Sequence, residues 1–516
     1  MGIRALSLFI GRLSYVCLAL LSGGRRRAIT SRAALLAGLV VLLVAPVLLA
    51  PPVAGAAQSQ VYVESVRDVC HFPRPDNNAK VVGQDWGYSA KLGSTTYFIF
   101  GDTFSDTNGD GGLSPTDEMT AIGNSIAKTT DEVAGDCIDN LTYKTDSRGF
   151  AAPLLPRVEP DECGAWPGGI VAANGQIYFF YLSVERDHCI VFENFRAYGT
   201  GLAKITNRDT MEATRIGTGP RPLFWDWGEP SFAHPFTVSG GWVYILGTRT
   251  PIDPLSPVYV ARVRENEIEQ EGQYEYWNVS SRSWVDQVPQ GGAAGIFEDH
   301  SYGIGNIPTI AYNSALDRYL ALYSCGVQRS LPLKTSATMI CARTAQQSGS
   351  SPTAITGDWN EPKVIYDCPD DFAVGPWLDC YGAFQYPWYG DGDTIYVVAS
   401  RNTRPPVEPG ADMHRYWVML REFKISDQPP SPGTRFINAA SDFSDTQLEH
   451  GWSYLTRRGS AFEFGLAWGD SHKAWVGTET LDTTLGTFSA PLLDQDSGYP
   501  SSTRDPVRAW RASEAG

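Results

Sequence analysis

Apolar and polar positions alternate along this chain with the period of β-strands, and the strands come in pairs. From Gln84 to Phe104 the sequence QDWGYSAKLGSTTYFIFGDTF reads as an apolar strand, a glycine-containing turn and a second strand rich in aromatic and β-branched residues. In an antiparallel hairpin the start of the first strand and the end of the second lie side by side. The pattern therefore predicts that Asp85 and Asp102 lie at the same edge, about 5 to 8 Å apart.

The same hairpin pattern recurs four more times, and every copy carries a tyrosine near the start of its second strand. The further copies are CGAWPGGIVAANGQIYFFYLS, WGEPSFAHPFTVSGGWVYILGT, GNIPTIAYNSALDRYLALYSC and YGAFQYPWYGDGDTIYVVASR. Their tyrosines stand 66 to 81 residues apart, which suits four-stranded blades joined by long loops: Tyr97, Tyr178, Tyr244, Tyr319 and Tyr396. Five copies predict an all-β fold, a five-bladed β-propeller. A single large sandwich of hairpins is the alternative.

The composition divides the chain into four parts: a leader at residues 1–56, the propeller as catalytic domain at 57–425, a linker at 426–434 and a C-terminal β-rich module at 435–516. The linker is rich in proline and serine. The last part is short for a two-sheet domain, so we expect an incomplete or degenerate β-sandwich module. Residues 60–80 are expected to reach the rim of the propeller and to supply a closing strand to its last blade.

Charge and leader composition indicate an exported protein. The formal net charge is -16, although the first 57 residues contain six arginines and no acidic residue. Such acidity disfavours nucleic-acid and anionic-lipid partners. The apolar run Ala33–Ala50 and the small residues after it predict a signal peptide cleaved before Ala57. A retained membrane anchor is the alternative. We expect a secreted monomer with no stable membrane partner.

Eight cysteines follow the leader, which is an even number typical of disulfide-bonded exported proteins. Spacing alone does not determine their connectivity. Pairs that lie close in sequence would each staple one blade or loop: Cys163 with Cys189, Cys325 with Cys341, and Cys368 with Cys380. The spacing of these cysteines matches no zinc-binding motif.

Acidic and aromatic residues occur where the innermost strand of each blade should begin. These strands surround the propeller axis, so the residues at their starts face one funnel. Hydrolysis of a glycosidic bond needs one carboxylic acid and one carboxylate, which Asp85 and Asp102 supply, with Glu229 as a reserve acid. Sugars present apolar faces to aromatic rings and hydroxyls to polar groups. The predicted substrate-binding residues are Trp86, Trp166, His234, Asn306 and Tyr381.

Structural roles are the alternatives for three of these residues. Asp102 could end its strand in an Asx turn, and Glu229 could simply precede Pro230 at the start of a strand. His234 could be a core histidine with satisfied hydrogen bonds.

The loop DTNGDGGLSPTD follows the first hairpin and has the residue spacing of a calcium-binding loop. Candidate ligands stand at its positions 1, 3, 5 and 12: Asp106, Asn108, Asp110 and Asp117. A solvated, turn-rich loop is the alternative, because Asn-Gly and Asp-Gly are common turn dipeptides. We expect no required cofactor, and Ca²⁺ is the one candidate ion.

The hairpin sequence, together with GNS at Gly123–Ser125 and the later WGEPS and SRN, resembles the actinobacterial family of five-bladed propeller endo-D-arabinanases, formerly catalogued as a domain of unknown function. The resemblance covers Val61–Ile425. It implies an exported enzyme that cuts α-linked D-arabinofuranose chains in mycobacterial-type arabinogalactan and lipoarabinomannan. It also implies that Asp85 and Asp102 occupy the catalytic aspartate positions, for which we expect an inverting outcome.

Two other functions are compatible with a propeller. A non-catalytic, lectin-like propeller would use the aromatic funnel for carbohydrate binding alone. A sialidase is disfavoured, because the repeated SxDxGxxW box is missing and an acidic chain suits an anionic sugar poorly.

Overall fold

The computed structural model describes residues 61–429, with gaps, and the backbone of a set of strands beyond residue 451. The gaps in the first part are residues 73–76, 108–118, 186–196, 250–256, 289–294, 327–338, 369–379 and 402–415. Regular structure in the described residues is β-strand, apart from 3-10 turns of three residues each. The predicted all-β class is confirmed. No helix within these residues is both long and apolar enough to cross a membrane.

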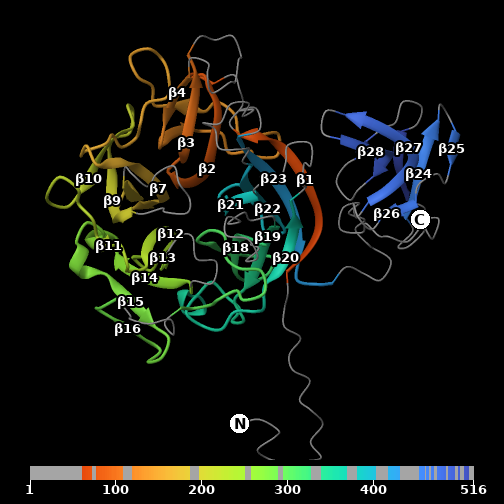
Figure 1. Cartoon of the computed structure of the whole chain (residues 1–516). Coiled ribbons are helices and arrows are strands. Elements are labelled where there is room, and N and C mark those ends of the chain that lie inside the picture. Colours follow the sequence, from red (N-terminus) through yellow and green to blue (C-terminus); the bar gives the residue numbers. More distant parts are fainter. Residues whose placement is uncertain are drawn as a thin grey trace, which may run out of the picture. The chain divides into compact units, whose positions relative to one another are not determined.

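Five sheets follow one another along the chain, and each forms one blade (Figure 1). Blade one contains β2 (Val81–Leu92), β3 (Thr95–Asp106), β5 (Ser125–Thr129) and β6 (Thr142–Tyr143), with β4 (Met119–Ile122) paired to β3. Blade two contains β7 (Glu162–Ala173), β8 (Gln176–Glu185), β9 (Ala197–Asn207) and β10 (Glu212–Ile216), with β11 (Trp225–Asp226) paired to β9. Blade three contains β12 (Ser231–Ser239), β13 (Trp242–Thr248), β14 (Tyr259–Arg264), β15 (Glu275–Asn278) and β16 (Ser283–Val285).

The last two blades complete the set. Blade four contains β17 (Thr309–Asn313), β18 (Arg318–Cys325), β19 (Met339–Thr344) and β20 (Lys363–Asp367). Blade five contains β21 (Cys380–Gln385), β22 (Thr394–Arg401), β23 (Trp417–Ser426) and β1 (Tyr62–Phe72).

The innermost strands of the five blades form a closed ring. Each of β2, β7, β12, β17 and β21 contacts the next, and β21 contacts β2. Strand β1 pairs antiparallel with β23, from Tyr62 opposite Ser426 to Phe72 opposite Val418. The N-terminal strand is therefore the outermost strand of the last blade, as predicted, and backbone hydrogen bonds join the two ends of the ring. The five-bladed propeller is confirmed.

Burial on both faces of each blade explains why the hairpins are visible in the sequence. In β3 the run Tyr97–Phe100 is 0 to 3% exposed, and in β8 the run Tyr178–Tyr181 is equally buried. Each blade is covered on both sides by its neighbours, so both faces of a central strand need apolar side chains. The repeated tyrosines keep a polar end: the hydroxyls of Tyr178, Tyr319 and Tyr396 donate to Glu269, the Ser350 carbonyl and Glu422.

Two disulfides staple the propeller. Cys325–Cys341 joins β18 to β19 within blade four, which confirms that predicted pair. Cys70–Cys137 joins β1 of the last blade to the connection between β5 and β6 of the first, and so reinforces the ring closure. Cys163 and Cys368 are also disulfide-bonded, and their predicted partners lie outside the described side chains.

The C-terminal part of the chain is β-rich. Its strands form a three-stranded sheet of β25 (Ala461–Glu463), β24 (Trp452–Arg458) and β30 (Asp505–Trp510). A four-stranded sheet contains β26 (Ala467–Gly469), β27 (Ala474–Thr483), β28 (Gly486–Leu493) and β29 (Gly498–Tyr499). All of these strands fall within the predicted module at residues 435–516.

Candidate active site

The first hairpin brings Asp85 and Asp102 together. Gln84 pairs with Thr103 and Trp86 pairs with Phe100, so Asp85 lies opposite the two residues Gly101 and Asp102. This two-against-one pairing is a β-bulge, a feature that often re-aims side chains beside functional sites. The bulge places both carboxyl groups near the start of the innermost strand β2.

Glycine at position 101 makes room for the Asp85 carboxyl group. A Cβ atom added to Gly101 would overlap Asp85 Oδ1 and press against the Trp86 indole. Trp86 itself has a φ of 68°, in the left-handed region that non-glycine residues seldom adopt. Its backbone N–H donates to Ser400 Oγ of blade five at 2.7 Å, which helps to hold this conformation. The sequence GDT, Gly101–Thr103, therefore makes room for one carboxyl group and supplies the other.

Asp85 is a buried carboxyl group with two phenol donors. It is 6% exposed, and its Oδ2 accepts hydrogen bonds from the hydroxyls of Tyr381 at 2.7 Å and Tyr416 at 2.8 Å. Its Oδ1 has no hydrogen-bond partner among the described residues. Burial and the neighbouring charge of Asp102 raise the pKa of Asp85 to about 8, although the two tyrosine donors oppose the shift. Asp85 is therefore protonated at neutral pH.

Asp102 is the more exposed member of the pair. Its burial is partial and raises its pKa to about 6, so the carboxylate form predominates at neutral pH. It lies beside Trp166 of blade two: a Cβ atom on Gly123 would touch the Trp166 indole and lie 3.8 Å from Asp102 Oδ1. Asp102 and Trp166 thus flank Gly123 from two blades.

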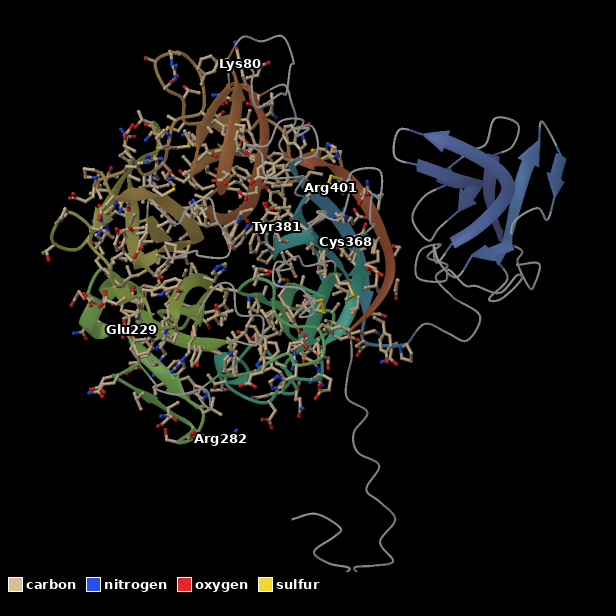
Figure 2. The ribbon with its side chains drawn as sticks, in the orientation of Figure 1. Lys80, Glu229, Arg282, Cys368, Tyr381 and Arg401 are labelled. Atoms are coloured by element: carbon tan, nitrogen blue, oxygen red, sulfur yellow. A yellow bond between two sulfur atoms is a disulfide. The ribbon has the colours of Figure 1, made fainter. Side chains whose placement is uncertain are left out.

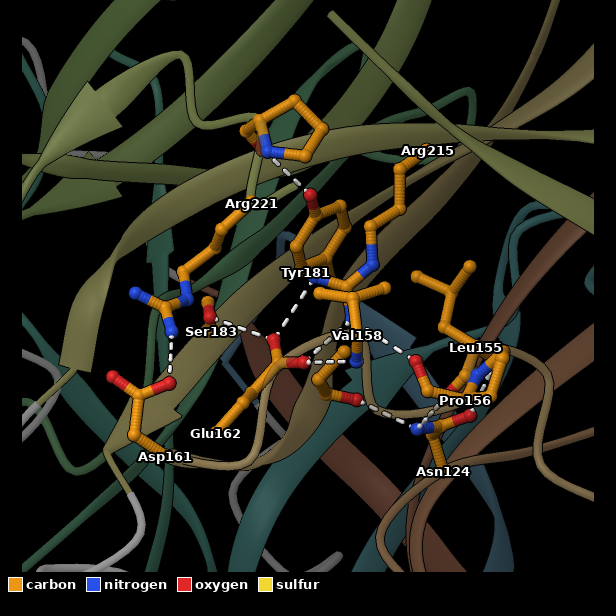
Figure 3. Close-up of polar contacts among 12 residues, drawn as sticks. Asn124, Leu155, Pro156, Val158, Asp161, Glu162, Tyr181, Ser183, Arg215 and Arg221 are labelled. Atoms are coloured by element: carbon orange, nitrogen blue, oxygen red, sulfur yellow. Dashed lines mark hydrogen bonds and ion pairs between the residues drawn. The ribbon is translucent and has the colours of Figure 1, made fainter. Parts of the chain in front are cut away.

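The side chain of Asn124 fixes this wall of the site. Its amide donates to the carbonyl oxygens of Leu155 and Ala165 at 3.1 and 2.9 Å, and its oxygen accepts from the Leu155 N–H at 2.8 Å. Figure 3 shows Asn124 and Leu155 in this arrangement. Because Ala165 directly precedes Trp166, the hydrogen bond from Asn124 fixes the backbone next to the indole.

The two carboxyl groups have the kind of surroundings that glycoside hydrolysis requires. Burial raises the pKa of both, and the more deeply buried Asp85 also lies in the field of the Asp102 charge, which favours the protonated form of Asp85. Such a pair can protonate a leaving oxygen and activate water or attack an anomeric carbon. Strongly shifted pKa values of this kind are typical of functional sites.

The raised pKa of Asp85 predicts a pH-dependent effect of the Asp85→Asn substitution on stability. A carboxyl group whose pKa rises on folding favours the folded state at pH below its unfolded pKa of 3.8, and that contribution is lost as pH rises toward about 8. Asparagine keeps an oxygen for the two tyrosines and cannot ionise. We expect the melting temperature of Asp85→Asn, relative to wild type, to rise by several degrees between pH 5 and pH 8.5.

Thermal unfolding of both proteins at the two pH values measures this difference. Asp286→Asn, at an exposed position after β16, controls for the general effect of removing one carboxyl group. A difference between Asp85→Asn and wild type that stays constant with pH would show that Asp85 ionises equally in the folded and unfolded chain.

The structure does not bring Glu229 to the aspartate pair. Figure 2 shows Glu229 at the edge of the propeller and Tyr381 near its middle. The Glu229 carboxylate accepts a hydrogen bond from the backbone N–H of Asp226 at 2.9 Å. Burial raises the pKa of the nearby Glu271 most, and the charges of Asp226 and Glu229 raise it further. Glu229 thus belongs to an acidic group with Asp226 and Glu271, where blades two and three adjoin.

The predicted substrate-binding residues separate into two groups. Tyr381 and Trp166 contact or flank the aspartates, and Trp86 packs partly buried against Tyr88 and Phe384. The side chain of Asn306 forms hydrogen bonds within blade four. Its amide donates to the Ile307 carbonyl, and its oxygen accepts from the Ser324 N–H.

His234 lies deeper along the axis than the aspartates. Its Nε2 meets the Tyr88 hydroxyl at 3.1 Å, and burial lowers its pKa to about 3, so the ring is neutral.

Only one of the candidate calcium ligands lies in the described part of the chain. Asp106 is buried at the end of β3, where its backbone N–H donates to the Lys80 carbonyl. Asn108, Asp110 and Asp117 lie outside the described residues. No group of three or more potential metal ligands occurs among the residues that are described. Calcium binding stays a prediction.

Tyr416 is the site residue that sequence reasoning missed. It contacts Asp85 from the start of β23, 331 residues away. It directly precedes β23 and lies outside the hairpin repeat, so no local pattern marks it.

This protein is a five-bladed β-propeller with a pair of carboxyl groups near the start of β2, the innermost strand of blade one. Its chain belongs to the family described as a domain of unknown function, DUF4185, whose model matches residues 73–422. No curated protein matches the sequence.

The chain is similar to solved structures at low sequence identity. A putative hydrolase from Bacteroides ovatus is 14% identical, with a TM-score of 0.50 over 67% of this chain and 86% of that one. The catalytic domain of a Coprinopsis cinerea GH62 alpha-L-arabinofuranosidase is 7% identical, with a TM-score of 0.35 over 71% and 98% of the two chains. A xylan beta-1,4-xylosidase from Bacillus halodurans is 11% identical, with a TM-score of 0.37 over 73% and 63%. The similarity to the Bacteroides ovatus protein concerns the fold alone.

Proposed function

We propose that this protein is a secreted glycoside hydrolase that cleaves arabinofuranosyl linkages within a cell-wall polysaccharide. The observation that carries the proposal is the Asp85–Asp102 carboxyl pair, which one β-bulge brings together beside Trp166 and Tyr381, and burial raises the pKa of both carboxyl groups. The neighbouring Trp166 and Tyr381 supply an aromatic wall and a phenol beside it. The disulfides support an oxidising, extracellular location.

The environments of the two aspartates assign their roles. Asp85, the protonated group, acts as the general acid and donates its proton to the leaving glycosidic oxygen. Asp102, the more exposed carboxylate, activates water or attacks the anomeric carbon. Tyr381 and Tyr416 orient Asp85 through its Oδ2.

A lectin-like propeller is the other candidate. It would need the aromatic wall but would gain nothing from a buried, protonated carboxyl group beside a carboxylate. The two functions separate when the purified protein is incubated with arabinogalactan, lipoarabinomannan, arabinan and xylan and the products are analysed by chromatography. Release of short arabinose oligosaccharides supports endo-acting hydrolysis. Binding without any product supports the lectin.

The same pair predicts a bell-shaped dependence of kcat/KM on pH. Activity should rise as Asp102 ionises near pH 6 and fall as Asp85 loses its proton near pH 8, with a maximum near pH 7. The two limbs belong to the coupled pair, not to single residues. Initial rates on a soluble arabinan between pH 4 and pH 10 measure the profile. A rate that keeps rising through pH 9 would exclude Asp85 as the acid.

A further inference from the structure

A cavity of about 340 Å³ lies at the far end of the propeller axis from the aspartate pair. All five innermost strands contribute to it or lead into it. On β2, Asp85 lies near the start of the strand, whereas Ser89 and Lys91, which line the cavity, lie near its end. The cavity is therefore a separate hollow at the opposite mouth of the ring.

A layer of buried aromatic rings forms the inner wall of this cavity. The Tyr88 ring, between Asp85 and Ser89 on β2, packs 3.9 Å from the Phe384 ring and 4.8 Å from the His234 ring, centre to centre. All three side chains are 5% exposed or less. Packed rings of this kind separate the cavity from the carboxyl groups above them.

Two exposed aromatic rings flank the cavity. Trp388 is 38% exposed and Tyr312 is 37% exposed, and in the described part of the chain only two other large hydrophobic side chains, both valines, are as exposed. Hydrogen bonds hold both rings: Trp388 Nε1 donates to Ser89 Oγ at 2.9 Å, and the Tyr312 hydroxyl donates to Asp317 at 2.6 Å. A ligand that stacks on them therefore loses little entropy in ordering them.

Polar groups between the rings can bond to hydroxyls. Ser89 Oγ already accepts the Trp388 N–H, and Thr309 Oγ1 accepts the Gln385 N–H at 3.2 Å, so both hydroxyls keep a hydrogen to donate. Nδ1 of His234, a residue that is 4% exposed, is buried without a hydrogen-bond partner among the described residues. A buried ring nitrogen without a partner costs free energy, which a ligand hydroxyl could recover.

The charge of the lining selects against ionic ligands. No acidic residue lines the cavity, and its one basic residue, Lys91, pairs with Glu132 at 2.7 Å. The volume is at the lower end of the range for small-ligand sites, which suits one or two rings. A neutral ring with an apolar face and several hydroxyls matches these features.

We propose that this far-mouth cavity is a second, non-catalytic saccharide-binding site that takes the end or a short stretch of a neutral glycan chain. The proposal rests on the proposed function in one respect, that the ligand comes from a polysaccharide substrate. Two sites on opposite ends of one propeller would hold neighbouring chains at once, so the far site would raise the local concentration of substrate for the cleft.

Tryptophan indole resonances can report on the two sites separately. We would use the Asp85→Asn protein, labelled with ¹⁵N-tryptophan, so that added chains stay intact. The probes are an α-linked D-arabinofuranose tetrasaccharide, xylotetraose and cellotetraose. Trp388→Phe and Trp166→Phe assign the two signals. We expect at least one probe to shift the Trp388 signal saturably, and Tyr312→Ala to weaken that binding at least about fivefold. Tyr312→Phe keeps the ring and is the matched control.

Each outcome decides the proposal. Saturable shifts of Trp388 support it, whether or not Trp166 responds. Shifts of Trp166 alone, or of neither signal, would overturn it. The proposed function is judged separately, by product release from the wild-type protein and by the Trp166 signal. If Tyr312→Ala does not fold, Trp388→Phe and Trp388→Ala are compared instead by affinity electrophoresis in gels that contain arabinan. We expect the alanine variant to bind the arabinan less and so to migrate faster than the phenylalanine variant.

Discussion

Replacing Asp85 or Asp102 with asparagine is expected to reduce polysaccharide cleavage by about 10²–10⁴-fold, the range typical for loss of a positioned acid or base. Asparagine preserves the size of each side chain, and Asp85→Asn keeps an acceptor for Tyr381 and Tyr416. The substitutions therefore remove proton transfer and leave the fold in place. Reducing-end release from a soluble arabinan, measured at pH 7, gives the rates, and circular dichroism confirms folding.

The double variant and two single controls sharpen this result. Because the aspartates act as one unit, the loss in the double variant should be far smaller than the product of the two single losses. Asp286→Asn, at an exposed position after β16, should keep activity within about twofold. Activity above a tenth of wild type in both single variants would remove the assignment. A loss confined to Glu229→Gln would move the acid role to Glu229.

Arg215→Met is expected to destabilise the propeller by about 3–5 kcal/mol, since it leaves Glu162 buried and unpaired. Glu162 is the first residue of β7 and is fully buried, and Arg215 bonds both of its oxygens at 2.9 and 3.0 Å. Ser183 and the backbone N–H of Val158 complete its hydrogen bonds, and the Arg215 guanidinium lies 4.7 Å from the centre of the Tyr181 ring. Figure 3 shows this cluster.

The pH dependence of this effect follows from the carboxyl group of Glu162. Burial opposes its ionisation, but the bonds from Arg215, Val158 and Ser183 outweigh burial and lower its pKa. A lowered pKa means that the stabilisation is present above the unfolded pKa of about 4.5 and is lost as pH falls below it. The difference between Arg215→Met and wild type should therefore shrink below pH 4. Urea unfolding at pH 7 and pH 3 measures both values.

An exposed ion pair provides the control for this prediction. Arg67 contacts Glu422 at 2.7 Å but its side chain is 52% exposed, so Arg67→Met should cost less than about 1 kcal/mol. Replacing both buried partners, as in Glu162→Leu with Arg215→Met, should recover part of the lost stability because no unpaired charge remains. Equal effects of Arg215→Met and Arg67→Met would show that the buried pair has no special role.

The candidate site was partly accessible from the sequence. Asp85 and Asp102 lie on one hairpin, whose strand pattern and short turn predict that the two residues meet. Trp166 and Tyr381 were predicted from their places at equivalent points of the repeat, and the structure brings both toward the pair. The same rule also selected Asn306, whose side chain bonds within blade four, because a position in a repeat does not say whether a side chain will bond to its own blade.

What the sequence determined by itself is the architecture. The five hairpins follow from local strand patterns, and burial on both faces makes those patterns strong enough to recognise. Only the tertiary structure decided the chemical states of the site. The pKa of Asp85 depends on burial, on Asp102 and on two tyrosines from the last blade, and Tyr416 reaches it from 331 residues away. Such shifts arise from desolvation and from charges gathered in space, and these exist only once the ring has closed.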